Sequence, residues 1–179
     1  VLAGAGTQTA GLAFGGFTPG NTADTEEYDG SSWTEQNNLN TARRGLSGAG
    51  IQTAAIAFGG NSTSPTNITE EYDGSSWTSG GNMNRANSNA SSGSGTQTAA
   101  LAAGGLISDA KVGTTEKYDG TSWTTTNPMA TARDNLGAST AGTTSASMVF
   151  AGRIGPNAKQ TITEEFTGSL NQAVNLSLI

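Results

Sequence analysis

A segment of about 45 residues occurs four times along the chain, and this repetition limits the possible folds more than any other feature. The clearest copy runs from Thr53-Ala-Ala-Ile-Ala-Phe-Gly-Gly60 to Thr69-Glu-Glu-Tyr-Asp-Gly-Ser-Ser-Trp-Thr78. The Gly-Gly pair recurs at residues 15/16, 59/60 and 104/105, with Ala-Gly at 151/152, so the spacings are 44, 45 and 47 residues. A period of this size is typical of a four-stranded propeller blade.

The second copy shows which strands each unit is expected to contain. Residues 45–50 form a first strand of small side chains, and residues 54–59 form a second strand that is almost continuously apolar. Such a run is typical of a strand buried on both faces. Residues 68–72 form a third strand, the Asp-Gly dipeptide after it indicates a hairpin turn, and a fourth strand begins at Trp77. No segment keeps an apolar period of 3.6 residues, so no helix is expected.

The order of these elements resembles the kelch repeat. The chain repeats a diglycine, then Glu-x-Tyr-Asp, then Trp, and then Leu/Met-x-x-Ala-Arg before the next unit. Asn38-Leu-Asn-Thr-Ala-Arg43 and Pro128-Met-Ala-Thr-Ala-Arg133 match the last element, whereas Asn82-Met-Asn-Arg-Ala-Asn87 has Asn where Arg is expected. The fourth unit departs furthest, with Phe166 in place of Tyr and no Trp after it.

The repeats and this resemblance together predict an all-β, kelch-type β-propeller with four-stranded antiparallel blades. We expect one repeat domain over residues 1–179, with blades at approximately 1–40, 41–84, 85–130 and 131–179. The four blades form either a closed ring or part of a larger propeller. Because the sequence begins with Val1 rather than Met, we expect a processed or partial chain.

Composition excludes several kinds of site. The chain has no cysteine and no histidine, so disulfides, thiolate metal sites and histidine-based catalysis are impossible. We therefore expect no metal, no cofactor and no catalytic residues. A net charge of −6 argues against a nucleic-acid partner, and no apolar run approaches the length of a membrane span.

Residues that recur from unit to unit are expected to serve the scaffold. The large aromatic residues should pack between adjacent blades, and each Glu of a third strand should pair with a recurrent Arg or with backbone amides. Asp29, Asp73 and Asp119 are expected to be turn residues. The predicted structural residues are Gly15, Gly16, Gly59, Gly60, Gly104, Gly105, Tyr28, Tyr72, Tyr118, Trp33, Trp77, Trp123, Glu26, Glu70, Glu116, Glu164, Arg43 and Arg133.

Residues that differ between the units are the better candidates for recognition. The segments joining the second strand to the third vary at 17–23, 61–67, 106–113 and 153–160, whereas the other hairpins are nearly identical in the first three units. These segments should share one face of the propeller with the links between units, and seven of the eight basic residues lie there. Loops on a rigid scaffold often carry binding residues. The predicted ligand-binding residues are Arg44, Arg85, Asp109, Lys111, Arg153 and Lys159.

These observations favour a non-enzymatic binding or structural module that presents its variable loops to a polar partner. The repeats are similar to the kelch-like repeats of bacteriophage tail and virion proteins. That similarity implies a virion-associated or extracellular protein whose partners are surface glycans or other chains of an assembly, and an oligomer is possible. Two alternatives stay open: a purely structural ring, and a carbohydrate-active enzyme that uses Asp24, Asp109 or Asp134.

Overall fold

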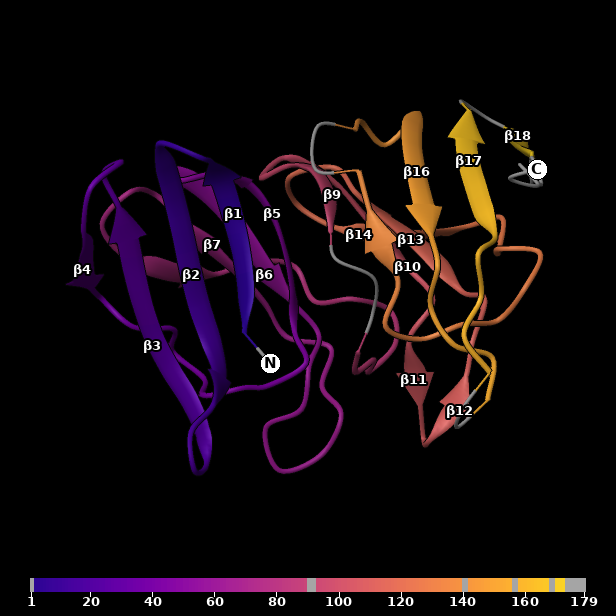
Figure 1. Ribbon diagram of the computed structural model, residues 1–179, viewed down its shortest axis with the longest axis horizontal. Coiled ribbons are helices and arrows are strands. Elements are labelled where there is room, and N and C mark those ends of the chain that lie inside the picture. The colour runs from indigo at the N-terminus through magenta and orange to yellow at the C-terminus, as the bar shows by residue number, and fades with distance from the viewer. Residues whose placement is uncertain (1, 90–92, 140–141, 156–157, 168–169, 173–179) are drawn as a thin grey trace.

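The computed structural model describes residues 2–89, 93–139, 142–155, 158–167 and 170–172, and these form an all-β structure. Four four-stranded antiparallel sheets are arranged as a four-blade propeller, which confirms the predicted fold class (Figure 1). The part of the fourth predicted blade at 173–179 lies outside the described residues. Among the residues described, no helix is long and apolar enough to cross a membrane.

In each blade the strands pair in sequence order, so every blade is an antiparallel meander. Blade 1 contains β1 (Ala3–Thr7), β2 (Ala10–Phe17), β3 (Asn21–Tyr28) and β4 (Trp33–Gln36). Blade 2 contains β5 (Ser47–Ile51), β6 (Ala54–Phe58), β7 (Thr69–Tyr72) and β8 (Trp77–Ser79). Blade 3 contains β9 (Ser94–Thr96), β10 (Ala99–Ala103), β13 (Thr115–Tyr118) and β14 (Trp123–Thr126). Blade 4 contains β15 (Gly137–Ala138), β16 (Ala146–Phe150), β17 (Thr163–Thr167) and β18 (Leu170–Gln172).

The hairpin between the third and fourth strands of each blade is fixed by an aspartate. In blade 2, Asp73 Oδ1 accepts hydrogen bonds from the backbone N–H groups of Ser75 and Ser76 at 2.9 and 2.8 Å. These backbone donors, Ser76 first, hold the pKa of Asp73 below its usual range. Asp119 accepts the same pair of bonds in blade 3, and Asp29 does so in blade 1, where they lower its pKa to about 2. These three residues are therefore turn residues in the structure.

The diglycine lets the end of the second strand approach the link to the next blade. Gly59 and Gly60 adopt φ values of 63° and 98°, which favour glycine. Gly60 donates a 2.7 Å hydrogen bond to the carbonyl of Asn87, and a Cβ on Gly59 would lie 2.6 Å from the same oxygen. A residue with a side chain at Gly59 would therefore push the two segments apart.

Adjacent blades pack through two different faces of each sheet. We call the face toward the preceding blade the front face and the face toward the following blade the back face. Between blades 1 and 2, Trp77 packs edge-on against Phe14, with ring centroids 4.9 Å apart, and donates from Nε1 to Thr25 Oγ1 at 3.0 Å. The hydroxyl of Tyr72 donates to Glu27 at 3.1 Å. Indole and phenol groups buried in this way keep a hydrogen-bond partner, as buried polar groups must.

The interface between blades 2 and 3 repeats the same contacts. Trp123 packs 4.8 Å from Phe58 and donates to Thr69 Oγ1 at 2.9 Å. Tyr118 donates its hydroxyl to Glu71. Burial, and then this hydrogen bond, raises the pKa of Tyr118 to about 12. Blades 3 and 4 meet through a smaller apolar cluster that includes Leu101, Ala103, Val149 and Phe166.

A buried arginine completes two of these interfaces. Arg43, in the link before blade 2, donates to the backbone carbonyls of Gly59 and Ile68 at 2.8 and 3.0 Å and to Glu70 at 2.9 Å. Arg133 makes the equivalent contacts with Ala151, Ile162 and Glu164 of blade 4 at 2.8, 2.9 and 2.7 Å. All four charged side chains of these two pairs are buried. Each guanidinium is paired with a buried carboxylate, which is the condition under which buried ions are tolerated, although Arg133 Nε has no hydrogen-bond partner among the described residues.

The third copy of this arrangement lacks its cation. Asn87 occupies the arginine position and donates only to the carbonyl of Gly104, at 2.7 Å. Glu116 is still buried, and one of its oxygens accepts hydrogen bonds from the backbone and side chain of Asn84 at 2.8 and 3.0 Å. Asn87 Oδ1 is also buried and has no hydrogen-bond partner in the part of the chain that is described.

Replacing Asn87 by arginine should therefore stabilise the protein. The guanidinium would reach Glu116 as Arg43 reaches Glu70, and a hydrogen bond between charged groups contributes about 1.5 kcal/mol or more. The free energy of unfolding of Asn87→Arg, measured in urea, should exceed that of the wild type by this amount. In a Glu116→Gln background, the same substitution should raise the free energy of unfolding much less. An equal gain in both backgrounds, or none in either, would contradict this account of the interface.

Candidate functional site

The antiparallel blades place two sets of connections at opposite ends of the propeller. One end, the turn face, carries the hairpins between the first and second strands and between the third and fourth strands. The other end, the loop face, carries the variable segments that follow each diglycine together with the links between blades. Paired backbone bonds join these two kinds of segment, between Arg44 and Asn61, between Ser88 and Leu106, and between Asp134 and Arg153. The scaffold therefore fixes where each variable loop begins.

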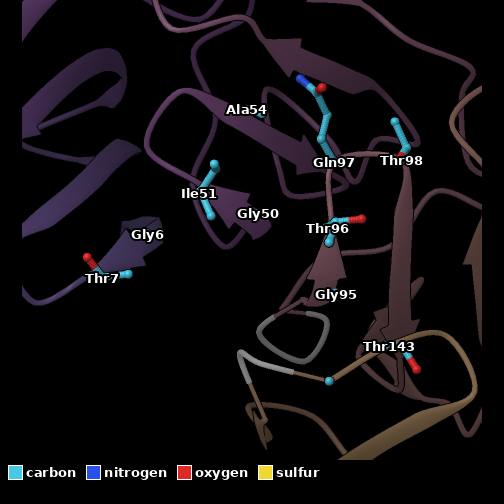
Figure 2. A pocket seen from close by; sticks show the side chains of 11 residues that line it. Gly6, Thr7, Gly50, Ile51, Ala54, Gly95, Thr96, Gln97, Thr98 and Thr143 are labelled. Carbon is cyan, nitrogen blue, oxygen red and sulfur yellow. The ribbon is translucent and has the colours of Figure 1, made fainter.

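A pocket of about 570 Å³ opens on the turn face at the axis of the propeller. Figure 2 shows Thr7, Ile51, Thr96 and Thr143 around it, one from each blade. Every residue that lines this pocket is uncharged. Its walls come largely from turns that are nearly identical in the first three units, so it offers few groups that could select a ligand.

A second cleft, of about 550 Å³, lies on the loop face between blades 2 and 3. We call it the loop cleft. Arg85, from the link before blade 3, and Asp109, from the loop of blade 3, both line it and are both exposed. The other lining residues are Asn61, Thr63, Ser64, Pro65, Ala86, Ser88, Ile107 and Ser108. The cleft thus combines a cation, an anion, and neutral donors and acceptors.

The position of Asp109 is set by a small hairpin. Strands β11 (Leu106–Ile107) and β12 (Ala110–Lys111) pair directly, leaving Ser108 and Asp109 as a two-residue turn. Both residues have positive φ, 49° and 64°, as the tight turns of two-residue hairpins require. A side chain on such a turn is held by the strands behind it, and this suits a binding residue.

Lys111 and Arg153 lie together on the loop face and share one carboxylate. Asp134 is fully buried, with Oδ1 2.8 Å from Lys111 Nζ and Oδ2 2.8 Å from an Arg153 guanidinium nitrogen. Burial opposes the ionisation of Asp134, but the hydrogen bonds and charges of the two cations outweigh it and hold its pKa below the usual range. The cluster joins the loop of blade 3, the link before blade 4 and the loop of blade 4. These two predicted ligand-binding residues thus hold blades together.

The other predicted ligand-binding residues lie apart from the loop cleft. Arg44 is exposed, and its guanidinium carbon lies 4.9 Å from the centroid of the Phe17 ring, at cation–π distance. Lys159 is exposed in the loop of blade 4, where its backbone pairs with that of Arg153. The structure therefore brings together Arg85 with Asp109 and Lys111 with Arg153, but it does not bring all six residues into one site.

The loop face carries less exposed positive charge than the number of its basic residues suggests. Arg43 and Arg133 lie in links between blades, which are part of the loop face, but both side chains are buried and paired with a glutamate. Lys111 and Arg153 are neutralised in part by Asp134. The exposed cations without such a carboxylate in the described part of the chain are Arg44, Arg85 and Lys159.

The neutral walls of the loop cleft were not singled out from the sequence. Asn61 and Ser64 belong to a loop that the sequence marks as variable, and so does Ser108, but nothing in one sequence distinguishes them from other Asn and Ser residues. The acids proposed for catalysis lie in separate blades, with Asp24 in β3 and Asp109 in the β11–β12 hairpin. Within the described residues, no three Asp or Glu side chains gather closely enough to hold a metal ion.

Removing the charge of Asp134 should destabilise the protein at neutral pH. Asp134→Asn leaves Lys111 and Arg153 facing a neutral amide, and we expect a loss of about 2 kcal/mol, less than for a fully buried pair because both cations are partly exposed. Since the folded-state pKa is lowered, this contribution is present above the unfolded value of about 3.9 and is lost as the pH falls through the folded value. Urea unfolding of the wild type and of Asp134→Asn, measured from pH 7 to pH 3, should show that the difference between their free energies of unfolding shrinks as the pH falls.

The exposed Asp24 supplies the control for this measurement, because Asp24→Asn removes one carboxylate without breaking an ion pair seen in the structure. It should change the free energy of unfolding by less than about 0.5 kcal/mol. Equal stability of Asp134→Asn and the wild type at pH 7 would show that the cluster is not structural.

Comparison with known proteins adds no family to this description. No protein family matches the chain, and no curated protein aligns with it significantly.

Proposed function

We propose that this protein is a non-enzymatic binding module that holds a glycan in the loop cleft. The observation that carries the proposal is the placement of Arg85 and Asp109 on the walls of one cleft, contributed by two different segments. Sugars present adjacent hydroxyl groups that both donate and accept hydrogen bonds. A guanidinium and a carboxylate in one cleft supply the matching acceptor and donors.

The rest of the cleft suits the same class of ligand. Asn61, Ser64 and Ser88 offer amide and hydroxyl groups, while Pro65 and Ile107 offer apolar surface for the C–H face of a sugar ring. A pocket of about 550 Å³ is within the usual size of small-ligand sites. The similarity of the repeats to kelch-like repeats of phage tail and virion proteins supports a location on a virion or cell surface, where glycans are abundant.

A glycan array followed by calorimetry tests the proposal. The protein should bind a defined set of glycans, and Arg85→Ala and Asp109→Asn should each weaken binding of the best ligand at least tenfold, because each removes a charge-assisted hydrogen bond of about 1.5–3 kcal/mol. Glu35→Gln, which neutralises an exposed acid on β4, should leave the affinity unchanged.

Three results would count against the proposal. Absence of binding to any glycan would favour the structural-ring alternative. Binding that survives both cleft substitutions would place the ligand elsewhere. Hydrolysis of the bound glycan would favour the carbohydrate-active alternative.

A further inference from the structure

The buried glutamates of blades 2 and 4 divide their two oxygens between a backbone donor and a cation. In blade 2, the backbone N–H of Asn40 donates to Glu70 Oε2 at 2.7 Å, whereas Glu70 Oε1 accepts from the guanidinium of Arg43 at 2.9 Å. Glu164 of blade 4 is held in the same way, by one backbone N–H on Oε2 and by an arginine on Oε1. In both blades Oε1 is therefore the oxygen that receives the positive charge.

Two backbone carbonyls complete the surroundings of the cation. Arg43 Nη1 donates to the carbonyls of Gly59 and Ile68, and the carbonyl of Ile68 also accepts the backbone N–H of Gly59 at 3.0 Å. In blade 3 the same backbone bond joins the N–H of Gly104 to the carbonyl of Thr114 at 2.9 Å. These two residues therefore present the equivalent pair of carbonyl oxygens in blade 3.

Blade 3 keeps the carboxylate as well, but the protein supplies no cation for it. Asn84 donates twice to Glu116 Oε2, as Asn40 does to Glu70, and Glu116 is only 2% exposed. Among the described residues, Glu116 Oε1 accepts no hydrogen bond, and no lysine or arginine forms an ion pair with Glu116. Burying a carboxylate without a partner is costly, so such groups are paired with a cation or bind a metal.

Asn87 adds a further oxygen at the place of the missing guanidinium. Its Nδ2 donates to the carbonyl of Gly104 at 2.7 Å, as Arg43 Nη1 donates to that of Gly59, so the amide lies in space that a guanidinium fills in blade 2. Asn87 Oδ1, bonded to the same carbon as Nδ2, is buried and has no hydrogen-bond partner in the described part of the chain. A buried oxygen of this kind calls for a water molecule or an ion beside it.

We propose that blade 3 binds a monovalent metal cation, Na⁺ or K⁺, in place of the missing guanidinium. The ligands are Glu116 Oε1, Asn87 Oδ1 and the carbonyl oxygens of Gly104 and Thr114. All of them are oxygen atoms, which hard cations prefer and which include the backbone carbonyls that bind K⁺ in other proteins. One carboxylate balances one positive charge, whereas a divalent ion would leave excess charge buried. The proposal is independent of glycan binding at the loop cleft.

Thermal unfolding in different chloride salts tests the proposal. At equal ionic strength, the Tm of the wild type should be higher in NaCl or KCl than in tetramethylammonium chloride, because the tetramethylammonium ion is too large for the site. At ten times the Kd of the bound cation, the difference should be about 3 °C or more. The Tm should level off as the site fills, and the salt that acts at the lower concentration identifies the preferred ion.

Two substitutions remove the site in different ways. Asn87→Arg supplies the guanidinium, so it should raise the Tm in tetramethylammonium chloride and abolish the dependence on Na⁺ or K⁺. Its advantage over the wild type should shrink as the concentration of the metal cation rises. Glu116→Gln removes the carboxylate and should also abolish the dependence. Glu35→Gln neutralises an exposed acid on β4 and is the control, in which the full shift should remain.

Any of three results would overturn the proposal. Equal Tm values in all three chlorides would show that water alone lies beside Glu116 and Asn87. A cation-dependent shift that persists in Asn87→Arg would place the ion elsewhere in the protein, and this variant decides the question even if Glu116→Gln does not fold. A larger shift in CaCl₂ of the same ionic strength, lost in Asn87→Arg, would assign the site to a divalent ion.

Discussion

The structure depends on the contact between the front face of one blade and the back face of the blade before it. A single four-stranded sheet of this chain is rich in Gly, Ser and Thr and buries little apolar surface by itself. The indole of Trp77 fills the space beside Phe14 while its N–H is satisfied by Thr25, so the largest side chain of the unit is buried without an unpaired donor. The Arg43–Glu70 pair adds a second connection, which reaches from the link between blades into the sheet. Repeat proteins are stabilised in this way, by interfaces between neighbours more than by the units themselves.

Most of this arrangement could be predicted from the sequence. The diglycine, the Asp-Gly turn and the aromatic spacing locate the strands to within about two residues, because each depends on local backbone chemistry or on a period of two. In the second unit the expected strands at 45–50, 54–59 and 68–72 correspond to β5 (Ser47–Ile51), β6 (Ala54–Phe58) and β7 (Thr69–Tyr72). The difference in burial between Trp33, which is 51% exposed, and Trp77 and Trp123, which are each 5% exposed, could not be predicted, because the repeat pattern is the same at all three positions.

The candidate site was predicted less completely than the fold. Variation between units pointed to the segments that line the loop cleft, but not to the contacts between them. Lys111, Asp134 and Arg153 are separated by about twenty residues at each step, and only the packing of three different segments brings them together. Arg85 and Asp109 meet at one cleft for the same reason. Counting basic residues overestimated the positive charge of the loop face, since a buried pair such as Arg133–Glu164 cannot be told from an exposed arginine by sequence position alone.

The most direct test of this account is hydrogen exchange at the indole N–H groups of Trp77 and Trp123, followed by NMR in D₂O. Both groups lie in blade interfaces and donate to a buried threonine. They should exchange only through the opening of those interfaces, and therefore many orders of magnitude more slowly than a free indole. In Thr25→Val the exchange of Trp77 should accelerate while that of Trp123 stays slow. If both indoles of the wild type exchange at the rate of free tryptophan, the blades do not pack as described.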